Sequence, residues 1–116
     1  MKKLSDFKGV DGIVIGAKVL GVVMEMLSDQ RNMAQKDETS TLKMFTGFME
    51  NSPDKMMEIF AILSEKEPSE YECDGAEAMT NMLLLANDPV IISLFTSQGR
   101  KRDAIASGSA TESSAG

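Results

Sequence analysis

The chain has 116 residues, a formal net charge of -6, one cysteine, ten methionines, and neither histidine nor tryptophan. These counts exclude a zinc site of cysteine and histidine ligands, a disulfide within one chain, and acid–base catalysis by histidine. The length predicts one domain. The acidic balance argues against nucleic-acid binding, because neutralising phosphates requires clustered Lys and Arg. We therefore expect a protein without enzymatic activity, metal, cofactor or nucleic-acid partner.

The first predicted helix covers residues 10–28. A stripe at helical spacing marks one face: Val10, Ile13, Val14, Ala17, Leu20, Gly21, Met24 and Leu27. The remaining faces are apolar as well, which is typical of a helix buried on several sides. The β-branched residues and glycines of this segment leave a strand as the alternative. The most apolar stretch, residues 12–27, carries Lys18 and Glu25 and is shorter than the roughly 20 residues that span a bilayer, so we expect no membrane association.

The middle of the chain alternates between polar breaks and apolar stripes. Residues 28–40 are polar and fit either a helical extension or a loop. A helix follows over residues 41–50, capped by Thr39, Ser40 or Thr41 and striped with Leu42, Phe45 and Met49. The next helix has Ser52 as its predicted N-cap and Pro53 as its first residue. It runs to residue 64 with one apolar face: Met56, Ile59, Phe60 and Leu63.

Two more helices follow an acidic turn over residues 65–73. Asp74 with Glu77 three residues later has the pattern of a capping box, and Asp88 before Pro89 predicts the cap of a last helix that ends near Phe95. From residue 99 the chain is rich in Ser, Gly and Ala and lacks aromatic residues, which is typical of disorder. The predicted fold is all-α: a compact bundle of about five helices over residues 1–98, with a disordered C-terminal tail over residues 99–116.

The methionines are the compositional excess that bears on function. Their flexible side chains fill irregular cores, and they also suit surfaces that adapt to a partner. Met44 and Phe48 lie offset from the stripe of their helix, and Met57 lies beside that of Met56. Because a small domain has limited core volume, we predict an apolar groove for a partner helix at these four residues: Met44, Phe48, Met56 and Met57.

Three segments, in order, resemble one known family. They are Lys3-Leu4-Ser5-Asp6-Phe7-Lys8-Gly9, then Phe60-Ala61-Ile62-Leu63-Ser64-Glu65 with Pro68-Ser69-Glu70-Tyr71, and finally Ser93-Leu94-Phe95-Thr96-Ser97-Gln98. The chain is similar in these segments, over about 98 residues, to the tail assembly chaperones of long, non-contractile-tailed phages of Gram-positive bacteria. It departs from that family in its Gly- and Val-rich first helix and its Met-rich centre.

The resemblance implies a small helical chaperone made in the cytoplasm of the infected bacterium and absent from the mature virion. Its implied partners are the long helical tape measure protein, which it would keep soluble, and the tail tube protein, which it would help to recruit. The alternative is a structural head–tail or tail-completion protein of a phage. A helical regulator acting on nucleic acid and an enzyme are disfavoured by the charge and by the missing histidine.

Overall fold

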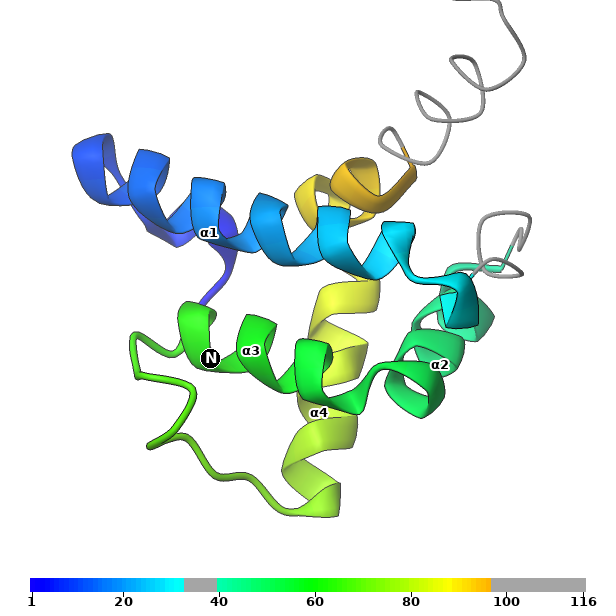
Figure 1. Cartoon of the computed structure of the whole chain (residues 1–116). Coiled ribbons are helices and arrows are strands. Elements are labelled where there is room, and N and C mark those ends of the chain that lie inside the picture. The colour runs from blue at the N-terminus through cyan, green and yellow to red at the C-terminus, as the bar shows by residue number, and fades with distance from the viewer. Residues whose placement is uncertain (33–39, 97–116) are drawn as a thin grey trace, which may run out of the picture.

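The computed structural model describes residues 1–32 and 40–96, and these residues form helices joined by turns (Figure 1). The elements in chain order are the short 3-10 turn η1 (Leu4–Asp6), α1 (Gly9–Ser28), α2 (Thr41–Asn51), α3 (Pro53–Leu63), α4 (Gly75–Ala86) and a last helix, Pro89–Thr96. The all-α prediction is confirmed, and the strand alternative for the first segment is excluded. The predicted disordered tail lies outside the described residues, as does most of the polar segment after α1.

Three of the predicted helix starts have the expected side-chain caps. The Ser40 side chain accepts a hydrogen bond from the backbone N–H of Lys43 at 3.4 Å. The Asp74 carboxylate accepts one from Glu77 N–H at 2.8 Å. Asp88 Oδ1 accepts one from the N–H of residue 90 at 3.0 Å. Each cap satisfies a backbone donor that the first turn of a helix leaves without an intrahelical partner.

The start of α3 differs from the prediction in the role of Ser52. Ser52 occupies the N-cap position and Pro53 the first turn, but the serine side chain makes no capping hydrogen bond. Instead, its Oγ accepts a hydrogen bond from Asn32 Nδ2 at 2.8 Å, and the same amide group donates to the Met26 carbonyl oxygen at 3.0 Å. Both polar side chains are fully buried. This contact ties the end of α1 to the junction of α2 and α3.

The helices cross one another around a single core. α1 packs on α3, while α2 packs on both α3 and α4. Figure 1 shows that the N-terminal turns of α1 (blue) extend past the end of α3. Among the described residues no single helix is both long and apolar enough to cross a bilayer, and α4 with Pro89–Thr96 meets that test only as a pair bent by 78°.

Aromatic side chains from the middle of the chain and from its last helix meet at the centre of the core. The Phe95 ring lies 5.1 Å from that of Phe45 in an edge-to-face arrangement and 4.9 Å from that of Phe48 in a stacked one. All three side chains are buried. The last helix therefore completes the core against α2, which explains why this short helix is held in place.

The buried face of α2 is not the one that the sequence predicts. Met44, Phe45 and Phe48 are buried, whereas Leu42 is 49% exposed. A stripe of Leu42, Phe45 and Met49 and a stripe of Met44, Phe45 and Phe48 both fit helical spacing, so periodicity alone does not separate them. The second stripe places two phenylalanines against Phe95, and this larger aromatic burial decides the orientation of α2.

The N-terminal segment fixes the start of α1. The Lys2 N–H donates to the Leu63 carbonyl oxygen at 2.9 Å, which attaches this segment to the end of α3. Gly9 then has a φ of +58°, a conformation that favours glycine. A Cβ on Gly12 would lie 2.9 Å from the Phe7 carbonyl oxygen. The close approach that Gly12 permits is therefore to the preceding turn and not to another helix.

Candidate functional site

Three of the four residues predicted to line a partner groove lie in the core. Phe48 and Met56 are 0% exposed, and Met44 is 6% exposed. Met57 is half-buried, with its Sδ 3.5 Å from the Sγ of Cys73. The predicted groove is thus corrected: Met44, Phe48 and Met56 are not at the surface of the described structure, because they belong to its hydrophobic core.

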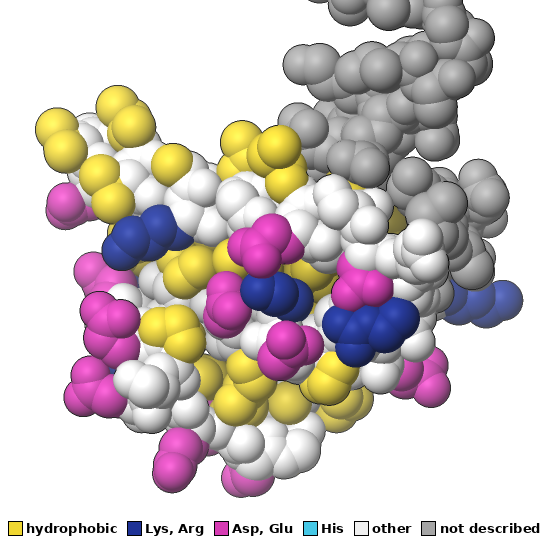
Figure 2. All heavy atoms as spheres, viewed as in Figure 1, with side chains coloured by type: hydrophobic (Ala, Val, Ile, Leu, Met, Phe, Trp, Pro, Cys, Tyr) yellow, Lys and Arg dark blue, Asp and Glu magenta, His cyan; other side chains and the backbone are white. Residues whose placement is uncertain are grey.

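The largest departure from the expected burial is on α1. One face of this helix is exposed along most of its length, and we call it the outward face; its residues are Val10, Ile13, Val14, Ala17, Gly21 and Met24. Val10 and Ile13 are 75% and 74% exposed. Figure 2 shows hydrophobic side chains gathered over the N-terminal end of α1, at the upper left. An exposed apolar surface that follows one helix is typical of an interaction site.

The outward face is most of the stripe that the sequence marks as the main apolar face of this helix. The core instead receives the opposite side of α1: Val19, Val22, Val23, Met26 and Leu27. Of the predicted stripe only Leu27 is buried, and Leu20 is half-buried. The expectation that α1 is buried on several sides is therefore wrong. Sequence reasoning identified these residues but could not assign them to the surface, because both sides of the helix are apolar.

The spacing of the outward face matches that of a helix–helix seam. Val10, Val14, Ala17, Gly21 and Met24 follow one another at alternating steps of four and three residues. This is the repeat by which one helix packs along another in coiled coils and helical bundles. The small residues in its middle allow close approach of a second backbone. The outward face can therefore hold a partner helix along its length.

Charged side chains flank the seam on one side only. Asp11 and Lys18 are exposed and lie seven residues apart, on the same flank. Neither forms an ion pair or side-chain hydrogen bond within residues 1–32 and 40–96. The other flank carries Ile13 and Leu20. A partner helix thus meets an apolar seam with one polar and one apolar edge.

An ion pair joins the C-terminal half of α1 to α3 at the surface. Lys55 Nζ lies 2.9 Å from Glu25 Oε2 and 3.5 Å from Glu58 Oε1. The hydrogen bond from Lys55 to Glu25 raises the pKa of the lysine above its ordinary value. The apolar contacts beneath this pair hold the opposite side of α1 against the core, so its outward face points away from the core. The outward face is thus already formed in the folded chain.

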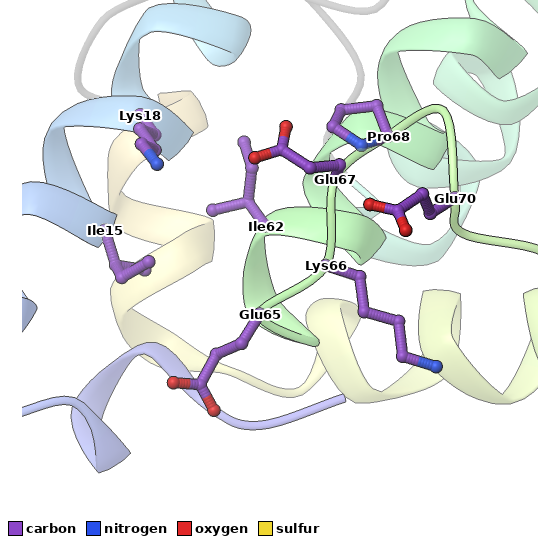
Figure 3. Close-up of a pocket in the computed structure, with 8 residues that line it drawn as sticks. All are labelled: Ile15, Lys18, Ile62, Glu65, Lys66, Glu67, Pro68 and Glu70. Carbon is purple, nitrogen blue, oxygen red and sulfur yellow. The ribbon is translucent and has the colours of Figure 1, made fainter.

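A hollow of ≈ 870 Å³ lies beside α1, against the turn that follows α3. Figure 3 shows Ile15 of α1 and Ile62 of α3 pointing toward one another across it, while the Lys66 side chain points away. The rim is charged: Lys18, Glu65, Lys66, Glu67 and Glu70. This mixed rim offers no apolar seam, so the hollow does not extend the outward face.

Exposed apolar side chains on α4 and the last helix form a smaller set. Met79, Leu83, Leu84 and Val90 are between 44% and 48% exposed. They do not continue into a stripe as long as that of α1. No group of three or more acidic or cysteine side chains in the described part of the chain is arranged to hold a metal ion. The outward face of α1 is therefore the strongest candidate site.

Comparison of the chain with models of known protein families, with curated proteins and with solved structures found no match.

Proposed function

We propose that the chain is a tail assembly chaperone of a long-tailed phage of Gram-positive bacteria. In this role it binds the helical tape measure protein, keeps it soluble, and helps to recruit tail tube subunits while the tail is assembled. It acts in the cytoplasm of the infected cell and is left out of the mature virion. The observation that carries the proposal is the exposed outward face of α1.

The chemistry of the outward face fits a client that is a helix. A long helical protein that is later enclosed in a tube exposes apolar stripes until enclosure. A chaperone for such a client needs a preformed apolar seam and no reactive groups. The seam from Val10 to Met24 supplies about 22 Å of helix for packing, from the rise of 1.5 Å per residue. Release then follows when tube subunits compete for the same stripe of the client.

The segments that carry the family resemblance contribute to the placement of this face. The first segment, Lys3 to Gly9, leads into α1 and includes the Phe7 carbonyl beneath Gly12. The second includes Leu63, whose carbonyl oxygen accepts the Lys2 N–H. The third brings Phe95 into the aromatic cluster. Because these residues act in packing, their resemblance supports a shared scaffold, while the client surface lies on the divergent first helix.

The test is co-expression with the tape measure protein encoded by the same phage. The native chain should bring the tape measure protein into the soluble fraction and co-purify with it. The double variant Val10→Glu with Ile13→Lys should lose both effects, because it places two charges on the outward face where a partner helix would bury them. The variant leaves the net charge unchanged. A tape measure protein that is equally insoluble with and without the native chain would contradict the proposal.

A matched control keeps the test specific to α1. Met79→Glu with Leu83→Lys introduces the same two charges on α4, at side chains that are 47% and 48% exposed. This variant should bind the client as the native chain does. If it loses binding while the α1 variant retains it, the site is on α4. Detection of the chain in purified virions by mass spectrometry would instead favour the alternative of a structural head–tail or tail-completion protein.

A further inference from the structure

We propose that the outward face of α1 binds a second copy of this chain, with the two α1 helices antiparallel and related by a two-fold axis. The inference concerns the chain by itself and does not depend on the proposed client. Its basis is that the surface is complementary to itself in volume, in charge and in the position of its glycine. In a two-fold pair every such contact occurs twice.

The volumes match when the two helices are centred between residues 15 and 16. In this register Val10 lies against the partner's Gly21, and Val14 lies against the partner's Ala17. Each larger side chain therefore meets a small one, which is how side chains of packed helices interdigitate. A parallel pair would instead place Gly21 opposite the partner's Gly21 and leave a void at the seam. The volumes therefore select the antiparallel arrangement.

The flanks match in the same register. Asp11 lies next to the partner's Lys18 on one side of the seam, since equivalent flanks face each other in antiparallel helix pairs. On the other side, Ile13 lies next to the partner's Leu20. Both charged side chains are exposed and lack an ion-pair partner within the described residues. The pair thus supplies two ion pairs and two apolar contacts.

Gly21 has no packing role among the residues that the structure describes. A Cβ at this position would meet nothing within 4 Å. Glycine inside a helix nevertheless destabilises it relative to other residues. Close approach of a second helix gives this glycine a role that the fold does not. The interface is one helix per copy, so we expect a dissociation constant on the order of 10 µM, in the range of small interfaces.

The first measurement is sedimentation equilibrium of the full chain at low salt, from about 1 to 300 µM, which brackets the expected constant. The mass should rise from the monomer value of 12.6 kDa toward twice that value. Gly21→Gln should weaken association by about tenfold or more, because its side chain collides with the partner's Val10. The same variant should raise the thermal midpoint of the monomer, since glutamine favours helix more than glycine does. A chain that stays monomeric throughout would overturn the proposal.

Charge reversal then tests the antiparallel register. Asp11→Lys alone and Lys18→Asp alone should each weaken association about 3- to 10-fold, because like charges face each other. An equimolar mixture of the two single variants should associate at least as tightly as the native chain, since Lys faces Asp at both positions. The double variant Asp11→Lys with Lys18→Asp should also associate as tightly as the native chain. A dimer that is indifferent to these changes, or singles that do not recover on mixing, would overturn the proposed interface.

These outcomes are separate from those of the client experiment. A monomeric chain that still solubilises the tape measure protein removes the dimer and leaves the proposed function standing. A chain that forms the dimer but fails to solubilise the tape measure protein removes the proposed function and leaves the dimer standing.

Discussion

Mutation of the outward face of α1 should change the stability of the fold little, whereas mutation of the core face of α2 should lower it strongly. We compare Ile13→Lys with Phe48→Ala. The Ile13 side chain is 74% exposed, so its replacement removes little buried area, and the free energy of unfolding should change by less than about 0.5 kcal/mol. Phe48 is 0% exposed and stacks on Phe95 at 4.9 Å. Its truncation should cost about 3–5 kcal/mol, because it removes buried apolar area and leaves a cavity.

The assay is urea unfolding followed by far-UV circular dichroism. The protein concentration should be about 1 µM, below the expected dimer constant, so that association does not contribute to stability. A small helical domain has a total stability of about 5–15 kcal/mol, so Phe48→Ala should lower the midpoint severely. If Ile13→Lys destabilises the fold as much as Phe48→Ala does, then the N-terminal half of α1 is packed inside the molecule, and the assignment of the outward face is refuted.

Three further predictions concern stability. Asn32→Ala should cost about 1–3 kcal/mol in urea unfolding, because it removes the two buried hydrogen bonds of the amide group, whereas the exposed Asn87→Ala should cost less than about 0.5 kcal/mol. Gly12→Ala should lower the thermal midpoint of unfolding, because its Cβ would lie 2.9 Å from a backbone oxygen. Gly21→Ala should raise the free energy of unfolding by about 1 kcal/mol, because its Cβ meets nothing and alanine favours helix. Equal shifts of the thermal midpoint in the two variants would contradict this difference. Burial raises the pKa of Tyr71, so this residue ionises first in the unfolded chain, and its contribution to stability should be complete below about pH 10 and be lost as the pH rises beyond it. Tyr71→Phe should make the fall in stability between about pH 8 and 11 shallower in unfolding experiments, while the ion-paired Lys2 and Lys55, whose pKa values are also raised, account for the fall that remains.

The existence and the starts of the helices are well predicted by local chemistry. Asp74 and Asp88 cap helices because a short carboxylate followed by helix-forming residues satisfies backbone donors within a few residues. Such interactions join residues that are close in sequence, so the sequence alone predicts them. Ser52 shows the limit: its hydroxyl could cap α3, but a buried amide twenty residues earlier uses it instead. No residue near Ser52 in the sequence indicates that Asn32 is its hydrogen-bond partner.

The assignment of buried faces is less predictable where a helix is apolar on more than one side. α1 and α2 each carry two stripes at helical spacing, and in both cases the core uses the stripe that the sequence does not favour. The choice depends on the shape of the surface that another helix presents, such as the ring of Phe95 against α2. For this reason the predicted groove residues on α2 and α3 proved to be core residues. For the exposed residues of α1, the sequence shows that they are apolar but wrongly predicts that they are buried.

The position of Phe95 determines when the fold can be completed during translation. Its ring contacts those of Phe45 and Phe48, which also contact each other, so these two side chains lack their final neighbour until the ribosome has synthesised residue 95. The contact between α1 and α3 needs only the first 63 residues. The nascent chain can therefore form α1 on α3 early, while the aromatic cluster is assembled near the end of synthesis. Through most of that interval the nascent polypeptide already presents the apolar seam of its first helix to the solvent.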